Sequence, residues 1–78
     1  LEWYLKVANQ GDADAQNNLG WMYASGLGVL KDDKQAVKWY LKAADQGDTD
    51  ARRNVVVLYK NGANTLKNDK QLLEWYLK

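Results

Sequence analysis

Apolar residues recur at helical spacing along the chain, and glycine-containing stretches divide this pattern into segments. Ala15, Leu19, Met22 and Tyr23 stand at positions i, i+4, i+7 and i+8, a spacing that predicts one amphipathic helix. Proline is absent, so only the glycine-containing stretches interrupt the helices. The pattern therefore predicts an all-α chain of five helical segments separated by four glycine-centred breaks.

Capping signals set the expected helix boundaries. Gly11 suits the end of the first helix, and Asp12 suits the start of the second. Asp32 followed by Gln35 resembles a capping box, and Asn68 followed by Gln71 repeats it. We expect helices over residues 1–10, from the cap at 12 to about 25, from the cap at 32 to 46, over 49–61 and over 69–78.

The third predicted helix carries a buried stripe of small and large apolar residues. Its members are Ala36, Trp39, Tyr40, Ala43 and Ala44. The small residues let a neighbouring helix approach closely, and the aromatic rings fill the remaining space. This stripe predicts that a neighbouring helix packs closely against the segment.

The sequence repeats with a period of 36 residues. The tetrapeptide Trp-Tyr-Leu-Lys begins at residues 3, 39 and 75, and an ungapped overlay of 3–38 on 39–74 is identical at 18 of 36 positions. A fixed period of this length predicts a solenoid, in which each unit buries its apolar face by stacking on a neighbour. We therefore divide the chain into repeat units 3–38 and 39–74 and the start of a third at 75–78, and expect 1–78 to be one fragment of a longer solenoid.

Composition excludes several classes of partner and cofactor. With 11 basic and 10 acidic residues the net charge is +1, which gives no basic stripe for a nucleic-acid backbone. No apolar run approaches the roughly 20 residues of a membrane span. Cysteine and histidine are absent, which excludes disulfides and metal sites built on thiolate or imidazole ligands. We expect no cofactor and no resident metal.

The residues that remain do not form a catalytic arrangement. The sole serine, Ser25, lies at the end of a predicted helix with no base near it in sequence. The carboxylate pairs at 12/14, 32/33 and 48/50 fall at helix starts, where capping and the helix dipole account for them. Gly26 and Gly28 follow a helix rather than a strand, which does not suit a phosphate-binding loop. The sequence therefore predicts that the chain is not an enzyme.

The repeat resembles the Sel-one-like repeat (SLR) family, a relative of the tetratricopeptide repeat. The matching residues are Ala15, Leu19, Gly20, Tyr23, Gly26, Gly28, Val29, Trp39, Tyr40, Lys42, Ala43, Ala44 and Gly47. The resemblance implies a right-handed superhelix of antiparallel helix pairs. It also implies that the first helix of each pair lines a concave surface, and that the protein is an adaptor or scaffold. The second unit departs from the pattern: Val56 replaces the glycine that would let two helices approach closely, so we expect this unit to be looser.

A candidate binding surface follows from residues that lie off the buried stripe. Trp21 is a large aromatic on the other face of its helix, a residue type common in binding hot spots. Together with the residues of the next unit it gives a mixed apolar and basic groove suited to an acidic segment, formed by Asn17, Trp21, Arg53, Val57 and Lys60. The alternative is that Trp21 packs along the array against Val57, its counterpart 36 residues later.

The predicted function is therefore a protein-interaction adaptor or scaffold that binds a peptide or protein segment on its concave face. The alternative is architectural: a rigid spacer, or a segment whose open apolar ends associate end to end with other copies. A third interpretation, the accessory part of an enzyme, requires catalytic residues outside these 78.

Overall fold

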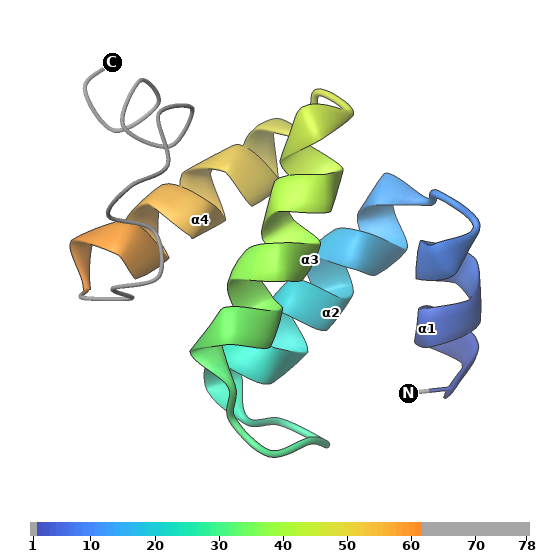
Figure 1. Cartoon of the computed structure of the whole chain (residues 1–78), viewed down its shortest axis with the longest axis horizontal. Coiled ribbons are helices and arrows are strands. Elements are labelled where there is room, and N and C mark those ends of the chain that lie inside the picture. Colours follow the sequence, from blue (N-terminus) through green and yellow to red (C-terminus); the bar gives the residue numbers. More distant parts are fainter. Residues whose placement is uncertain (1, 62–78) are drawn as a thin grey trace.

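The chain folds into consecutive helices joined by short turns (Figure 1). The computed structural model describes residues 2–61, and within them the elements are α1 (Glu2–Asn9), α2 (Ala13–Ser25), α3 (Asp33–Asp45) and α4 (Thr49–Lys60). These bounds agree with the first four predicted helices to within one or two residues, and residues 2–61 contain no strand. The all-α prediction is thus confirmed. The fifth predicted helix and the second capping box lie outside the described residues.

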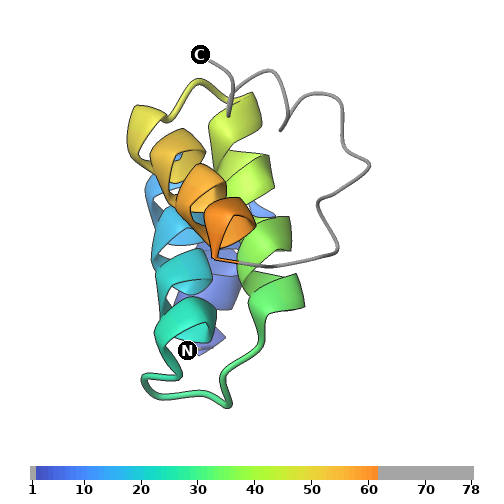
Figure 2. The ribbon, with the colours of Figure 1, turned by 90° about the vertical axis from the view of Figure 1, so that its left-hand side faces the viewer.

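Each helix packs mainly on the one that precedes it and the one that follows. The principal contacts join α1 to α2, α2 to α3 and α3 to α4. Figures 1 and 2 both show α1 and α4 on opposite sides of the α2–α3 pair. Within residues 2–61, no helix is both long and apolar enough to cross a lipid bilayer.

The same cap begins α2 and α4, which stand at equivalent positions of the repeat. The Oδ1 atom of Asp12 accepts a 3.0 Å hydrogen bond from the amide of Ala15, and Asp48 accepts one of 3.0 Å from Ala51. Each carboxylate satisfies a backbone donor that has no partner within the first helical turn. The repeat in the sequence is therefore also a repeat in local geometry.

The N-terminus of α3 is a simpler cap than the sequence predicted. Asp32 Oδ1 accepts hydrogen bonds from the amides of Lys34 and Gln35, at 3.0 and 3.2 Å. In a full capping box the Gln35 side chain would accept from the Asp32 amide. That amide instead donates to the carbonyl of Tyr23, at 2.9 Å. The cap thus ties the start of α3 back to the last turn of α2.

A left-handed glycine ends α2. Gly26 has φ 73°, and its amide donates to the Met22 carbonyl at 2.8 Å, while the Leu27 amide donates to the same oxygen at 3.2 Å. A residue with a Cβ adopts this conformation only at a cost, which is why glycine suits the position. The α2 helix therefore ends at this turn, and the chain continues through a loop to α3.

Two apolar clusters form the core, and α3 contributes to both. The first cluster consists of Ala8, Ala15, Leu19 and Trp39. The second cluster consists of Ala36, Val37, Tyr40, Ala43, Ala44, Ala51 and Val55. All five residues of the predicted stripe on α3 are buried, which confirms the stripe. Residues of both α2 and α4 share clusters with it.

Gly20 of α2 lies directly against an aromatic ring of α3. A Cβ added to Gly20 would lie 2.6 Å from Cδ1 of Tyr40, a separation that real Cβ atoms do not reach. The prediction that this glycine permits a close helix contact is confirmed, and its partner is an aromatic ring. Tyr40 is only 3% exposed, and this burial raises its pKa from 10.0 to about 12, because the phenolate form is poorly solvated there.

Candidate functional site

A side-chain hydrogen bond joins α2 to α4. The amide nitrogen Nδ2 of Asn54 donates to Oδ1 of Asn17 at 3.2 Å, across 37 positions of sequence. Both residues are half-buried. Asn17 was a candidate for contacting a partner, and the structure uses its carbonyl oxygen to hold two helices of the chain together. We call the surface on either side of this bond the α2–α4 face; it comprises Asn17, Trp21, Arg53, Val57 and Lys60.

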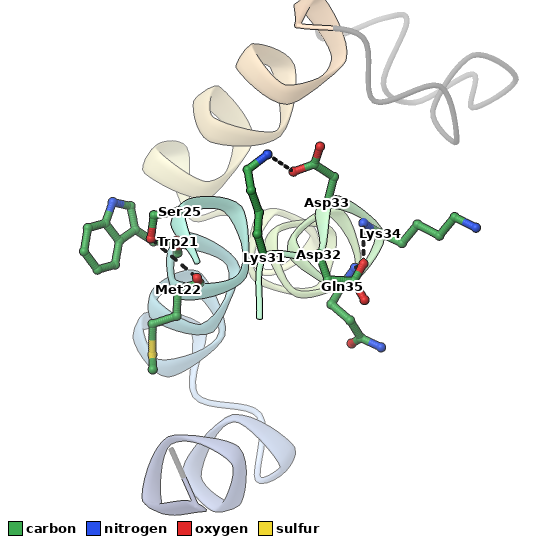
Figure 3. Close-up of polar contacts among 8 residues, drawn as sticks. All are labelled: Trp21, Met22, Ser25, Lys31, Asp32, Asp33, Lys34 and Gln35. Atoms are coloured by element: carbon green, nitrogen blue, oxygen red, sulfur yellow. Dashed lines mark hydrogen bonds and ion pairs between the residues drawn. The ribbon is translucent and has the colours of Figure 1, made fainter. Parts of the chain in front are cut away.

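Trp21 and Val57 follow the two asparagines by about one helical turn and remain accessible. The exposed fractions are 51% for Trp21 and 48% for Val57. Figure 3 shows the indole of Trp21 projecting from α2 on the side away from α3. Neither side chain is buried against the other, although they occupy equivalent positions of successive repeats. Both can therefore contact a ligand without a change in the helices.

The basic residues of the α2–α4 face lie on α4. Arg53 forms a 2.8 Å ion pair with Asp50, one turn earlier, and both side chains are largely exposed. An ion pair in this setting adds little stability, so it opens readily when another carboxylate approaches. Lys60 lies in the last turn of α4 and is also exposed. The face thus combines two apolar side chains with two cations.

A pocket of about 290 Å³ lies on the other flank of Trp21. Its lining comes from α1, α2 and the α2–α3 loop and consists of Tyr4, Asn18, Trp21, Met22, Leu27 and Gly28. The sequence did not predict it, because its lining combines residues of α1, α2 and the α2–α3 loop that lie far apart in the chain. Leu27 is 59% exposed. Because it lies outside the helices, the helical periodicity does not predict its exposure.

The polar groups near this surface serve local structure. The Ser25 hydroxyl donates to the carbonyl of Trp21 at 2.8 Å, as Figure 3 shows. Near the centre of Figure 3, Lys31 pairs with Asp33 at 3.5 Å. Among residues 2–61, no three acidic side chains are grouped so that they could hold a metal ion. The side chains of the α2–α4 face can make apolar contacts, amide hydrogen bonds and ion pairs.

Comparison with known proteins identifies the repeat. Residues 1–12, 13–48 and 57–78 match the Sel1 repeat. The crystal structure of a Sel1 repeat protein from Oxalobacter formigenes is 47% identical, with a TM-score of 0.83, over 97% of this chain and 31% of that one. The crystal structure of a protective antigen from uropathogenic Escherichia coli strains, which displays an SLR fold, is 36% identical, with a TM-score of 0.79, over 95% and 16%.

The chain thus spans less than a third of the length of either solved relative. A search of curated protein sequences gives no match. The segment that matches one whole repeat, residues 13–48, has the length of the 36-residue period and contains α2 and α3. The match extends over most of the sequence and agrees with the helix pairs, the caps and the glycine contact described above. The chain belongs to the Sel1 repeat family.

Proposed function

We propose that this chain is a protein-interaction module that binds a peptide or protein segment along the α2–α4 face. Sel1 repeats generally mediate protein–protein interactions, and Sel1 repeat proteins are typically non-catalytic scaffolds. The 78 residues of this chain cover 31% of the length of the solved relative from Oxalobacter formigenes. Its contribution to binding therefore depends on the surface that its own helices present.

The observation that carries the proposal is the exposure of Trp21 and Val57 beside a fixed interhelical bond. The Asn17–Asn54 hydrogen bond joins α2 and α4 in the absence of a ligand. A surface that is ordered in advance loses less entropy on binding. Tryptophan is also among the residues that contribute most binding energy in protein interfaces. Half of the Trp21 surface is available for this contact.

The charges of the face indicate the chemistry of the partner. Arg53 and Lys60 supply positive charge on α4, whereas the exposed acid of α2, Asp14, lies one turn before Asn17 and Asn18. An acidic segment that runs closer to α4 than to α2 would pair with the cations and avoid Asp14. Apolar side chains of the same segment would pack on Trp21 and Val57. The proposed partner is therefore an acidic segment with interspersed apolar residues.

The test is affinity capture with the full-length protein, followed by measurement of the dissociation constant for each captured partner. Wild type is compared with a Trp21→Ala, Arg53→Glu double variant. Truncation of a tryptophan hot spot together with reversal of a contacting charge should weaken binding at least about 30-fold. Helicity must be unchanged, which is expected because both side chains are half-exposed or more.

A control variant makes changes of the same kind at another site: truncation of an exposed apolar side chain and reversal of a positive charge. Leu30 is 90% exposed in the α2–α3 loop, and Lys34 is exposed in the first turn of α3. A Leu30→Ala, Lys34→Glu variant should bind like wild type. If both double variants retain full affinity, the α2–α4 face is not the binding surface; if both lose it equally, the effect is not specific to that face.

A further inference from the structure

Asn61 is the only asparagine of the chain that is followed by glycine. The other asparagines precede glutamine, asparagine, leucine, valine, threonine or aspartate. Glycine has no Cβ, so its backbone nitrogen is hindered less than that of any other residue, and the backbone around it adopts more conformations. The Asn61–Gly62 pair is therefore the place in this sequence where an asparagine side chain is most open to attack by the next backbone nitrogen.

The structure places Asn61 just outside a helix. The residue follows Lys60, the last residue of α4, and it is exposed. Its backbone amide donates to the Val57 carbonyl at 3.0 Å, whereas its side chain makes no hydrogen bond with other residues of the described segment 2–61. Rotation of this side chain therefore breaks no hydrogen bond within that part of the chain.

The other asparagines of residues 2–61 lie in helices. Asn17 and Asn18 belong to α2, Asn54 belongs to α4, and Asn9 is the last residue of α1. The backbone nitrogen after a helical residue donates to a carbonyl one turn earlier, and the nitrogen after Asn9 also donates to carbonyls of α1. Such a nitrogen is held in place and reacts only after the helix opens locally. Sequence and structure thus select the same residue, Asn61.

We propose that Asn61 is a site of spontaneous deamidation, and that this reaction weakens the binding of an acidic partner to the α2–α4 face. The second part rests on the proposed function. The backbone nitrogen of Gly62 attacks Cγ of Asn61, and its proton leaves with the side-chain amino group as ammonia. One water then opens the resulting succinimide at either carbonyl, giving aspartate or isoaspartate. No atom is oxidised or reduced, and water is the only co-reactant.

Deamidation introduces a carboxylate at one end of the proposed binding surface. Asn61 lies beside Lys60 and one helical turn after Val57, and both of these residues belong to the α2–α4 face. A carboxylate there offsets the positive charge of Lys60 and repels the carboxylates of an acidic segment. It also stands at the C-terminal end of α4, where the helix dipole disfavours negative charge. The reaction therefore removes part of the positive charge that an acidic partner requires.

The first repeat has no such site. Ser25 is the counterpart of Asn61, 36 positions earlier, and it too precedes a glycine. A serine has no amide to lose, and the Ser25 hydroxyl donates to the carbonyl of Trp21 at 2.8 Å. Among residues 2–61, deamidation therefore acts on the α4 side of the face and leaves Trp21 unaltered. The comparison also supplies a conservative replacement, Asn61→Ser, which carries the residue of the first repeat.

The first experiment is peptide mass spectrometry of the full-length protein after incubation at mildly alkaline pH in water enriched in heavy oxygen. Reaction through the succinimide places the heavy oxygen in the new carboxylate. Asn61 should convert at least about tenfold faster than the helical asparagines, because those react only after local unfolding. Conversion of Asn61 at the same rate as the helical asparagines would overturn the proposal.

Variants of the reacting pair test the route. Gly62→Ala should slow the conversion about tenfold, because the added Cβ hinders the attacking nitrogen and restricts the backbone. Asn61→Ser removes the reacting amide, and its peptide should take up no label. A synthetic peptide of residues 57–66, with glycine or alanine at position 62, repeats the comparison without a contribution from folding. Equal rates for the glycine and alanine forms would contradict attack by this nitrogen.

Affinity measurements test the consequence for binding. Asn61→Asp carries the charge of the product and should weaken binding of the captured acidic partner about three- to tenfold, whereas Asn61→Ser should bind like wild type. If Asn61→Asp binds normally while the Trp21→Ala, Arg53→Glu variant does not, the effect on affinity is refuted and the α2–α4 face stands. If that double variant also binds normally, the proposed function and the effect on affinity both fail, and the heavy-oxygen label still decides whether Asn61 deamidates.

Discussion

Gln46 donates a 2.8 Å side-chain hydrogen bond from Nε2 to Oε1 of Gln16. Gln16 is only 5% exposed, and its own Nε2 donates to the Ala8 carbonyl at 3.0 Å. One buried side chain on α2 therefore links the last turn of α1 to the residue that ends α3. Both polar atoms of the Gln16 side-chain amide therefore have a hydrogen-bond partner, and the two bonds stabilise the packing of three helices at one point.

Replacement of Gln16 by alanine should destabilise the fold by about 1–3 kcal/mol. The change removes the acceptor of the Gln46 side-chain amide and one of the donors to the carbonyl of Ala8, which keeps its bond from the Gly11 amide. Urea denaturation of wild type and variant measures the difference. Gln10→Ala, at the exposed equivalent of Gln46 in the first repeat, is the control and should change stability by less than about 0.5 kcal/mol. A double-mutant cycle between Gln16 and Gln46 should give a coupling of about 1 kcal/mol; zero coupling would contradict the hydrogen bond.

Gly20→Ala should lower stability even though alanine is the better helix former. Alanine gains about 1 kcal/mol of helix propensity over glycine. Against this, its Cβ would meet the Tyr40 ring at 2.6 Å, and the ring is too buried to move aside. Overpacking of this kind costs about 1–3 kcal/mol, so we expect a net loss in thermal denaturation. Asn18→Ala, on an exposed position of the same helix, should be neutral or stabilising; a stabilised Gly20→Ala protein would show that the contact yields easily.

Asp32→Ala should destabilise the protein by about 0.5–2 kcal/mol, because two amides at the start of α3 lose their acceptor. Asp32→Ser keeps a capping oxygen and should recover most of the loss. Asp33→Ala removes a neighbouring carboxylate that forms only an exposed ion pair with Lys31, and it should have little effect. Equal losses for Asp32→Ala and Asp33→Ala in denaturant unfolding would contradict the cap.

Alkaline pH should unfold the protein in part through Tyr40. Its pKa is raised from 10.0 to about 12 by burial. Below about pH 10 both the folded and unfolded states hold the phenolic proton, so ionisation of Tyr40 does not lower the free energy of unfolding. As the pH rises from about 10 through about 12, the unfolded state has released its proton while the folded state still holds it. The free energy of unfolding therefore falls over this range, by roughly 2–3 kcal/mol in total. The Tyr40→Phe variant should lose about 2–3 kcal/mol less stability than wild type over this pH range, as measured by denaturation at several pH values. Identical pH profiles for the two proteins would refute the contribution of Tyr40.

Local signals predicted most of the fold. The caps at Asp12 and Asp32 and the turn at Gly26 depend on residues within five positions of one another, so the sequence contains them completely. The 36-residue period then predicted stacking of the helices, and the Gly20 position predicted a close contact. The sequence did not identify the partner of that contact, the ring of Tyr40, which lies 20 positions later in the chain.

The candidate site was predicted less completely, because its contacts join residues far apart in the chain. The helical spacing placed Asn17 off the buried stripe of α2, and the side chain is half-buried, but its bond to Asn54 depends on how two helices are offset along their axes. The link through Gln16 has the same origin: periodicity places a glutamine near the apolar face without saying which carbonyl it reaches. Arg53 was expected to add positive charge to the groove, whereas its pairing with Asp50 depends on a rotamer.

The neighbouring residues Trp39 and Tyr40 belong to different clusters, and this division determines how the chain unfolds. α1 contributes to the cluster of Trp39 and α4 to the cluster of Tyr40, yet both rings belong to adjacent residues of α3. If α3 unfolds, both clusters therefore lose their α3 residues at the same time. The two helix pairs should accordingly unfold in one cooperative transition, and a helix pair cut out of the array would be far less stable than half of the whole.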